Sequence, residues 1–172
     1  MFVDECSTNI ALTRLYARAP KGERAFGHAP RNWGKNVTLI CSMGAEGIGA
    51  AMSVEGATDG AAFETYVKHF LAPTLKRGQV VVMDNLQVHK MKRVRELVED
   101  AGAEVLFLPP YSPDFSPIEE AFSKVKGILR RIGARTREAL LDATAEALDA
   151  VSRTDVRGWF GHCGYHLPHH SL

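Results

Sequence analysis

The proline-rich segment LPPYSPDFSPIEEAFSKVK, residues 108–126, constrains the fold more than any other part of this 172-residue chain. Four prolines occur in its first ten positions. Each proline fixes its own φ angle and disfavours helical backbone in the residue before it. The segment therefore predicts a stiff turn followed by a helix that opens with Glu119 and Glu120. A surface loop needs no such stiffness, so we expect one of these carboxylates to be aimed at a site.

The helical pattern of residues 117–132 distinguishes the two carboxylates. At about 100° per residue, the apolar side chains gather in one stripe. That stripe comprises Ile118, Ala121, Phe122, Val125, Leu129 and Ile132. Glu119 falls about 100° from the stripe, at its edge, whereas Glu120 falls near 200° and is expected to face solvent. Lys126 and Arg130 share the flank of Glu119, which places two cations beside that carboxylate.

The remaining pattern predicts an α/β chain with a mixed sheet. The expected strands are residues 2–6, 13–19, 37–42, 48–54, 79–83 and 105–108. The expected helices are residues 59–73, 89–101, 117–132 and 137–151, with Thr58 or Asp59 capping the first and Thr136 the last. Strands crowd the first half of the chain, and strands alternate with helices in the second half. We therefore expect antiparallel pairing first and parallel pairing later.

Composition bounds the class of protein. Hydrophobic residues make up 45% and charged residues 24% of the chain, which is ordinary for a single globular domain. The three cysteines, Cys6, Cys41 and Cys163, form no CxxC pair, so neither a disulfide framework nor a zinc knuckle is expected. Asp4 and Glu5 stand where a signal peptide would be basic and apolar. No apolar stretch approaches the roughly 20 residues of a membrane span, so we expect a cytoplasmic protein.

The net charge of +1 conceals local basic clusters. Six basic residues and no acid occur from Ala121 to Arg137, namely Lys124, Lys126, Arg130, Arg131, Arg135 and Arg137. A second cluster after Asp84 comprises Lys90, Lys92, Arg93 and Arg95. Either run is compatible with a solvated helix face or with a surface that binds a polyanion.

Three acids are expected to meet at one edge of the sheet. Asp84 ends the buried strand 79–83, and the carboxyl ends of strands in an open α/β sheet form the usual site crevice. If the first strand pairs with that strand, Asp4 becomes its neighbour, and Glu119 arrives from the helix. Three converging carboxylates repel one another, and a divalent cation removes that cost. Oxygen ligands alone suit Mg²⁺ or Mn²⁺.

Two histidine features have simpler explanations than metal binding. His89, five residues after Asp84, is expected to be a polar residue at a helix start. The C-terminal tail contains His162, His166, His169 and His170, which would suffice for zinc. Because Gly164 and Pro168 break any rigid ligand frame, a frayed terminus is the preferred interpretation.

Three segments together resemble a known family, the DDE transposases of the mariner superfamily, in its bacterial insertion-sequence branch. The segments are FVDE (residues 2–5), VVMDNLQVHK (residues 81–90) and LPPYSPDFSPIEEAFSKVK (residues 108–126). The separation of 34 residues between Asp84 and Glu119 is typical of that superfamily. The ending RGWFGHCGYH, residues 157–166, is also similar, so the resemblance covers nearly the whole chain.

The resemblance implies a ribonuclease H-like fold, with a mixed five-stranded sheet and helices on both faces. It implies that Asp4, Asp84 and Glu119 are the catalytic triad and hold two Mg²⁺ or Mn²⁺ ions. The implied activity is DNA strand cleavage and strand transfer by phosphoryl transfer. The residues expected to contact DNA phosphates are Lys126, Arg130, Lys90 and Lys92.

The chain departs from the family pattern in two ways. Ser116 and Phe122 stand where family members often have Asn and Trp, and Ser116 is expected to alter the helix cap. Family members also carry a helix-turn-helix region upstream, whereas this chain starts three residues before Asp4. We therefore expect residues 1–172 to be one catalytic domain without that region.

The expected partners are transposon-end and target DNA, together with a second copy of the chain or an upstream DNA-binding chain. Two alternatives stay open. The first is a catalytically silent or regulatory fragment that binds DNA or full-length transposase. The second is another ribonuclease H-like nuclease such as a junction resolvase, which would not predict the proline-rich turn.

Overall fold

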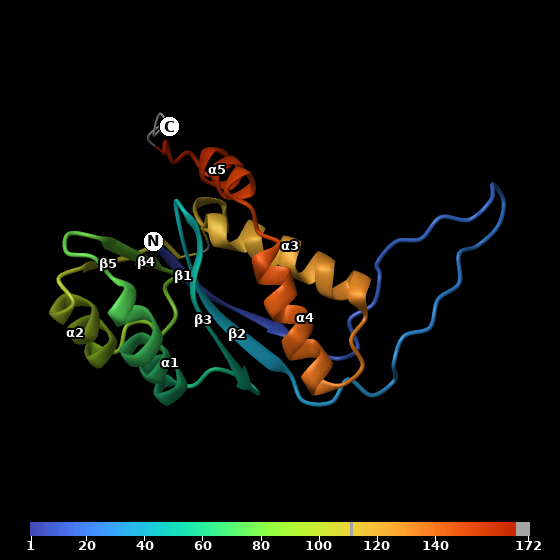
Figure 1. Ribbon diagram of the computed structural model, residues 1–172, viewed down its shortest axis with the longest axis horizontal. Helices are drawn as coiled ribbons and strands as arrows, with labels where there is room; N and C mark the ends of the chain where they lie inside the picture. The colour runs from blue at the N-terminus through green and yellow to red at the C-terminus, as the bar shows by residue number, and fades with distance from the viewer. Residues whose placement is uncertain (111, 168–172) are drawn as a thin grey trace.

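A five-stranded mixed sheet forms the centre of the protein, as Figure 1 shows for the computed structural model, which describes residues 1–110 and 112–167. The strand order is β3-β2-β1-β4-β5. The strands are β1 (Phe2–Thr8), β2 (Val37–Gly44), β3 (Gly47–Glu55), β4 (Val80–Met83) and β5 (Glu104–Phe107). β1, β2 and β3 pair antiparallel, whereas β4 is parallel to both β1 and β5. The predicted mixed sheet, antiparallel first and parallel later, is confirmed.

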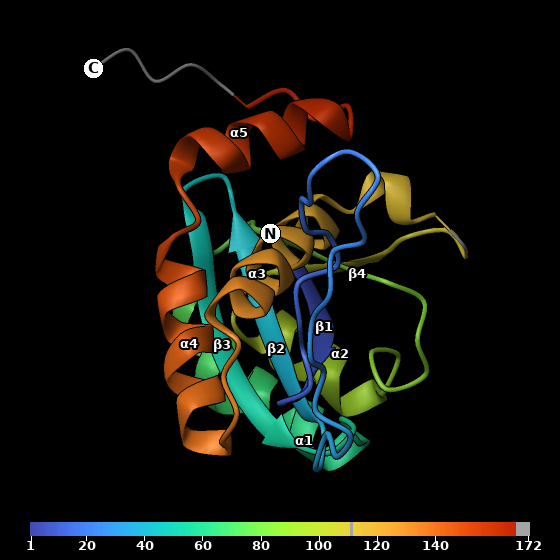
Figure 2. The same ribbon diagram turned by 90° about the vertical axis from the view of Figure 1, so that its right-hand side faces the viewer.

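Helices cover both faces of this sheet, as predicted (Figures 1 and 2). One face carries α1 (Gly60–Tyr66) and α2 (Lys92–Asp100), and the other carries α3 (Pro117–Ile132), α4 (Arg137–Asp149) and α5 (Arg153–His162). The predicted caps Asp59 and Thr136 each accept a hydrogen bond from a backbone N–H of the first helical turn. Among the described helices, none has the length and apolar character needed to cross a membrane.

Strand β1 distributes its side chains between the two helical layers. Phe2 and Cys6 pack against α3 and α5, whereas Val3 packs against α1 and α2. Because side chains alternate along a strand, Asp4 belongs to the α3 face and Glu5 to the α1 face. Two consecutive carboxylates therefore leave the same strand in opposite directions.

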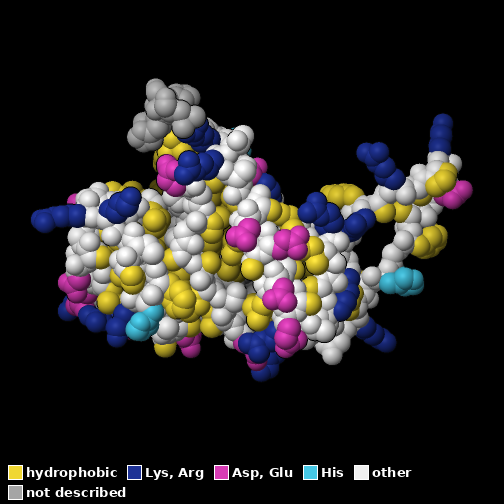
Figure 3. Space-filling model, in the orientation of Figure 1, with side chains coloured by type: hydrophobic (Ala, Val, Ile, Leu, Met, Phe, Trp, Pro, Cys, Tyr) yellow, Lys and Arg dark blue, Asp and Glu magenta, His cyan; other side chains and the backbone are white. Residues whose placement is uncertain are grey.

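The strand expected at residues 13–19 is wrong. Residues 9–36, all of them described, contain no strand and form an arm that projects from the body of the protein (Figure 1). Both edges of β1 are already paired, with β2 and β4, so the chain leaving β1 finds no free edge there. Tyr16, on this arm, is 88% exposed. Figure 3 shows Lys and Arg side chains standing out along the same arm.

The described part of the C-terminal region, up to Leu167, packs against the body through α5 and Tyr165, and the rest of the tail expected to fray lies outside the described residues. Ser152 and Asp155 cap α5 reciprocally, side chain to backbone, in a capping box. Tyr165 packs against Phe2 at 5.2 Å between ring centroids, and its hydroxyl donates to the Phe115 carbonyl at 2.8 Å. His169 and His170 lie outside the described residues.

The apolar stripe of α3 is confirmed for five of its six predicted members. Ile118, Ala121, Phe122, Val125 and Leu129 are buried. The sixth, Ile132, is 40% exposed, and Ile128 is buried in its place. Helix α4 packs against α3 and covers the side where Ile128 lies, which widens the stripe. The helix ends directly after Ile132, at Gly133 with φ of 67°.

The buried Leu129 and the partly exposed Ile132 allow a test of the packing. Leu129→Ala should lower the free energy of unfolding by about 2–5 kcal/mol, because it opens a cavity between α3 and α4. Ile132→Ala, on the same helix, should cost less than about 1 kcal/mol, because its side chain is partly in water already. Urea unfolding followed by circular dichroism measures both values. Equal losses would mean that α4 does not pack where the structure places it.

Candidate active site

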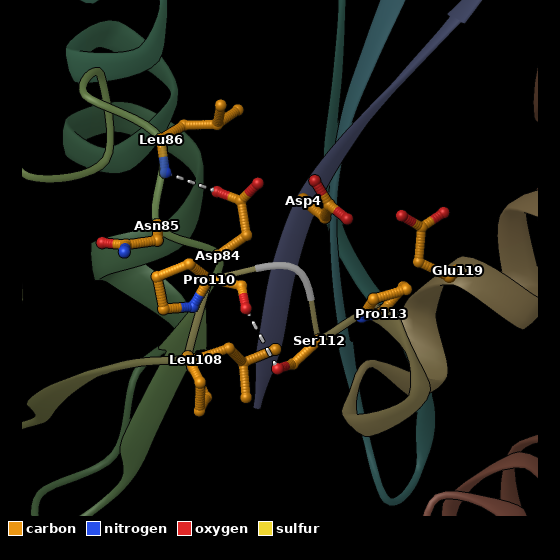
Figure 4. A pocket seen from close by; sticks show the side chains of 10 residues that line it. Asp4, Asp84, Asn85, Leu86, Leu108, Pro110, Ser112, Pro113 and Glu119 are labelled. Atoms are coloured by element: carbon orange, nitrogen blue, oxygen red, sulfur yellow. Dashed lines mark hydrogen bonds between the residues drawn. The ribbon is translucent and has the colours of Figure 1, made fainter.

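Asp4, Asp84 and Glu119 line one cavity of about 410 Å³ (Figure 4). Asp4 comes from β1, Asp84 directly follows β4, and Glu119 lies in the first turn of α3. Val3 pairs with Met83 in the parallel ladder between β1 and β4. Asp4 and Asp84 each follow one member of that pair, which confirms the prediction that these two acids lie on adjacent strands.

The proline-rich segment forms a wall of this cavity. Pro109, Pro110 and Pro113 line it together with Leu86 and Leu108. These side chains make the wall largely apolar, so it limits how much water surrounds the carboxylates. The stiff turn predicted from the prolines therefore lies directly beside the acids.

The same segment fixes the start of α3. A short 3₁₀ turn, Pro113–Phe115, precedes the helix, and Ser116 N–H donates to the Pro113 carbonyl at 2.8 Å. Glu119 N–H then donates to the Ser116 carbonyl at 3.1 Å. The Ser116 side chain is buried and makes no capping hydrogen bond, in line with the expected change at the helix cap. The direction of Glu119 is therefore set by backbone geometry on the turn.

Asp4 is largely removed from water and lies near two other carboxylates. Burial is the main cause that raises its pKa, to about 7 from the ordinary value of 3.8. The Glu5 N–H donates to Asp4 Oδ1 at 2.7 Å and opposes this rise. The charges of Glu119 and Asp84 add to it. Asp4 therefore resists ionisation in the folded protein.

Asp84 has the opposite tendency. Burial would raise its pKa, but contacts with His89 and the Leu86 N–H outweigh burial and lower it. Leu86 N–H donates to Asp84 Oδ1 at 3.0 Å, and His89 Nδ1 lies 2.5 Å from the same oxygen. No hydrogen bond or ion pair from the described residues reaches Oδ2. Figure 4 shows the Leu86 hydrogen bond and the carboxylate of Asp84 beside Asp4.

His89 is a residue of the site that the sequence reasoning missed. It was expected to be a polar residue at a helix start, but it is completely buried in the turn before α2. Its Nε2 lies 3.1 Å from Glu5 Oε2, and its ring lies 4.5 Å from that of Phe63. Burial disfavours the charged imidazole, but Asp84 and Glu5 outweigh burial and raise the pKa of His89 to about 9. The signal available in the sequence was strand alternation, which turns Glu5 away from Asp4.

Glu119 and Glu120 point to different surroundings, as predicted, but the expectation that Glu120 simply faces solvent is incomplete. Glu119 lines the cavity with Asp4 and Asp84. Glu120 does not simply face solvent, because its Oε1 lies 3.2 Å from His162 Nδ1 of α5 and its side chain is 41% exposed. The sequence reasoning did not expect α5, so it could not anticipate this contact.

The four residues expected to contact DNA phosphates lie in different surroundings. The Lys126 ammonium lies beside the buried Cys6 thiol, on the Asp4 face of β1. Lys90 is near enough to Asp84 to help lower its pKa. Arg130 lines a separate hollow next to the arm, and Lys92 pairs with Glu96 at 3.3 Å. Lys126 and Lys90 therefore lie near the acids without lining the cavity, whereas Arg130 and Lys92 lie elsewhere.

Half of the basic run from Ala121 to Arg137 has a structural role. Lys124 pairs with Asp155 at 2.5 Å, and Arg137 pairs with Glu55 at 3.3 Å. Arg135 donates to the backbone carbonyls of Ile10 and Leu12, which ties the base of the arm to the body. Lys126, Arg130 and Arg131 have no ion pair within residues 1–110 and 112–167. These three cations are available to an anionic partner.

The acids of the cavity have the chemistry of a magnesium or manganese site. Within the described part of the chain, no group of three or more His, Cys, Asp or Glu side chains forms a complete metal centre. The donors nevertheless are oxygens only, and Asp84 Oδ2 and both Glu119 oxygens carry no protein partner among the described residues. Repulsion by Glu119 and Asp84 contributes to the raised pKa of Asp4, and a divalent cation would relieve it. The residues therefore fit a divalent ion.

Comparison with known protein families gives one match. The model of a family described as DDE superfamily endonuclease matches residues 1–141, which include all three acids of the cavity. No curated protein matches the chain significantly.

Several solved structures share the fold. The chain is similar to the Mos1 transposase in its paired-end complex with the left transposon end, with 19% identity and a TM-score of 0.75 over 94% of this chain and 51% of that one. It is also similar to the Mos1 strand transfer complex, with 21% identity and a TM-score of 0.70 over 95% and 51%. It is similar as well to the catalytic domain of Mos1 mariner transposase, with 16% identity and a TM-score of 0.65 over 95% of this chain and 77% of that one. The predicted ribonuclease H-like fold is confirmed, and the chain spans about half the length of the transposases in those complexes.

The raised pKa of Asp4 predicts a stability effect in metal-free protein. An acid whose pKa is raised on folding costs stability as the pH rises above its ordinary value of 3.8, and the full cost is reached above about 7. Asp4→Asn keeps an acceptor for Glu5 N–H but cannot ionise. At pH 8 with a chelator it should raise Tm by at least about 2 °C, since 1 kcal/mol shifts Tm by about 2–4 °C in a protein of this size.

The difference should fade towards pH 4, and thermal melts across this range measure it. Asp142→Asn, an exposed acid on α4, is the matched control and should change little at any pH. A lower Tm for Asp4→Asn at pH 8 would contradict the electrostatic account.

Proposed function

Because the chain belongs to the DDE superfamily of endonucleases, we propose that it is the catalytic domain of a mariner-type transposase, of the bacterial insertion-sequence kind. Its reaction would be cleavage of a DNA strand at a transposon end, followed by joining of the freed 3′-hydroxyl to target DNA. The observation that carries this proposal is the convergence of Asp4, Asp84 and Glu119 in one cavity. The matched structures, a paired-end complex and a strand transfer complex, support the same reaction class.

The three acids would hold two Mg²⁺ or Mn²⁺ ions. Asp4 and Asp84 would share one, and Glu119 would share the other with Asp4 or Asp84. When bound, the ions activate the attacking water or 3′-hydroxyl and stabilise the leaving oxygen. Mos1 structures with Mn and with Mg are among the matches, which supports this choice of metal.

The other residues of the site would bind and enclose the DNA backbone. Lys126 carries its ammonium on the Asp4 face of β1, where it would contact a phosphate next to the scissile one. Lys90 would contact the strand from the Asp84 side. The apolar wall of Leu86, Leu108 and the prolines would limit water at the reacting phosphate.

The proposed partners are DNA and at least one further protein chain. The matched transposases are about twice as long, so recognition of specific DNA ends would require a DNA-binding region or a partner chain that supplies one. The paired-end complex of Mos1 favours a second copy as the other partner. Such an enzyme would act in the cytoplasm at the nucleoid.

Metal binding at the acids is directly testable. Mn²⁺ should raise the Tm of the metal-free protein, because binding only to the folded state stabilises it. Asp84→Asn should remove most of this shift, whereas the exposed control Asp142→Asn should retain it. Thermal melts with increasing Mn²⁺ give both results. If Asp84→Asn retains the full shift, the metal binds elsewhere.

The role of Glu119 gives the sharpest test of catalysis. Glu119→Gln should reduce Mn²⁺-dependent nicking of DNA by several orders of magnitude, because it removes a charged metal ligand. Glu120→Gln, its neighbour in the same helical turn, should stay within a few-fold of wild type, because Glu120 contacts His162 outside the cavity.

The nicking assay needs DNA ends at high concentration, or an added DNA-binding partner, because binding by this chain alone should be weak and salt-dependent. Equal losses in both variants would show that the start of α3 is oriented differently. Full activity in Glu119→Gln would remove the transposase mechanism and leave a regulatory fragment.

A further inference from the structure

Glu5 and His89 connect β1 to Asp84 from the side of the sheet opposite the cavity. Glu5 Oε2 lies 3.1 Å from His89 Nε2, and His89 Nδ1 lies 2.5 Å from Asp84 Oδ1. We infer that Glu5 and His89 are positioning residues, which hold Asp84 so that its Oδ2 is presented to the metal. This inference rests on the proposed function, in which Asp84 is a metal ligand.

The contacts from Glu5 through His89 to Asp84 are buried, and we infer a functional role from this because they do not favour stability. The His89 side chain is completely buried and the Glu5 side chain is only 11% exposed. Glu5 Oε1 is buried without a hydrogen-bond partner in the described part of the protein, which lowers stability. His89 Nδ1 is close to Asp84 but poorly aligned for a hydrogen bond, so the contact is an ion pair. An apolar pair would serve stability better.

Both protein groups that contact the Asp84 carboxylate approach the same oxygen. Leu86 N–H and His89 Nδ1 each approach Oδ1, at 3.0 and 2.5 Å. Leu86 and His89 both belong to the turn between β4 and α2, and both contact Asp84, the first residue of that turn. One oxygen is therefore occupied by protein groups, and Oδ2 stays available to a ligand in the cavity.

Glu5 links the contacts around Asp84 to Asp4, the neighbouring acid of the cavity. Asp4 and Glu5 are consecutive in β1, and they leave the strand on opposite faces. Asp4 enters the cavity directly, whereas Glu5 reaches Asp84 through His89. The same short piece of backbone thus sets the positions of both acids, and the outer partners of metal ligands commonly change metal affinity about 10–100-fold.

The test compares two uncharged replacements of equal length. Glu5→Gln keeps an oxygen that can accept from His89 Nε2, whereas Glu5→Met does not. Titration calorimetry with Mn²⁺ should give a Kd about tenfold weaker for Glu5→Met than for Glu5→Gln. In the nicking assay, kcat should fall in Glu5→Met while KM for DNA stays unchanged. Glu104→Met, an exposed glutamate in β5, is the control and should match wild type.

A double-mutant cycle tests whether Glu5 acts through His89. In a His89→Ala background, exchanging Glu5→Gln for Glu5→Met should no longer change the Mn²⁺ affinity, because the connecting group is gone. Phe63→Leu disturbs the packing of the His89 ring without removing its two contacts, so it should lower Tm and leave the Kd for Mn²⁺ unchanged. Circular dichroism checks that each variant is folded.

The outcomes separate this inference from the proposed function. Equal affinities for Glu5→Gln and Glu5→Met would overturn the positioning role, even where Asp84→Asn abolishes Mn²⁺ binding and the proposed function stands. A difference that persists without His89 would also overturn it. If Mn²⁺ binding survives in Asp84→Asn, the proposed function and the positioning role fall together.

Discussion

The parallel pairing of β1 with β4 is the constraint on which the rest of this structure depends. Val3 opposite Met83 brings Asp4 and Asp84 to the same end of two central strands, although 79 residues separate them in the chain. Hydrophobic side chains on both faces hold the pair in register, because a slip by one residue would exchange the two faces of β1. The register that buries Val3 and Met83 thus also forces two carboxylates together.

The two neighbouring carboxylates have pKa values that are shifted in opposite directions. Burial and neighbouring charge raise the pKa of Asp4, whereas His89 and the Leu86 N–H lower that of Asp84. The anionic form of Asp84 is therefore favoured, whereas that of Asp4 is disfavoured, and a nearby cation would relieve this penalty. A site of this kind favours a divalent cation.

The wall around the acids is formed and contacted by segments from the C-terminal half of the chain. The proline-rich turn lines the cavity and aims Glu119, and Tyr165 donates to Phe115 at the end of that turn. His162 of helix α5 also contacts Glu120 outside the cavity. The C-terminal region thus contacts the end of the turn and gives Glu120 a partner outside the cavity.

Local patterns in the sequence were sufficient for the five strands of the sheet, for helices α1 to α4 and for naming the three acids as candidates. Proline stiffness, the buried run before Asp84 and the helical stripe of residues 117–132 each reflect interactions between residues near one another in the chain. The failures have one physical origin, since each depends on what packs from far away. Residues 13–19 follow β1, whose two edges are already paired with β2 and β4. Ile132 is partly exposed, whereas Ile128 is buried, and Glu120 contacts the unexpected helix α5.

The amino-acid sequence by itself thus determined the five strands of the sheet and the helices α1 to α4, because these follow from periodicity and backbone stiffness. It also named Asp4, Asp84 and Glu119 as candidate acids, through their places at strand and helix ends and through the family resemblance. Only the tertiary structure decided that Glu5 and His89 support Asp84 from behind the sheet. Glu5 and His89 are 84 residues apart, and the contact between them exists because the β1–β4 register and the packing of α1 bring both to one buried place. No local pattern encodes such a contact, since its free energy comes from the folded surroundings of both residues.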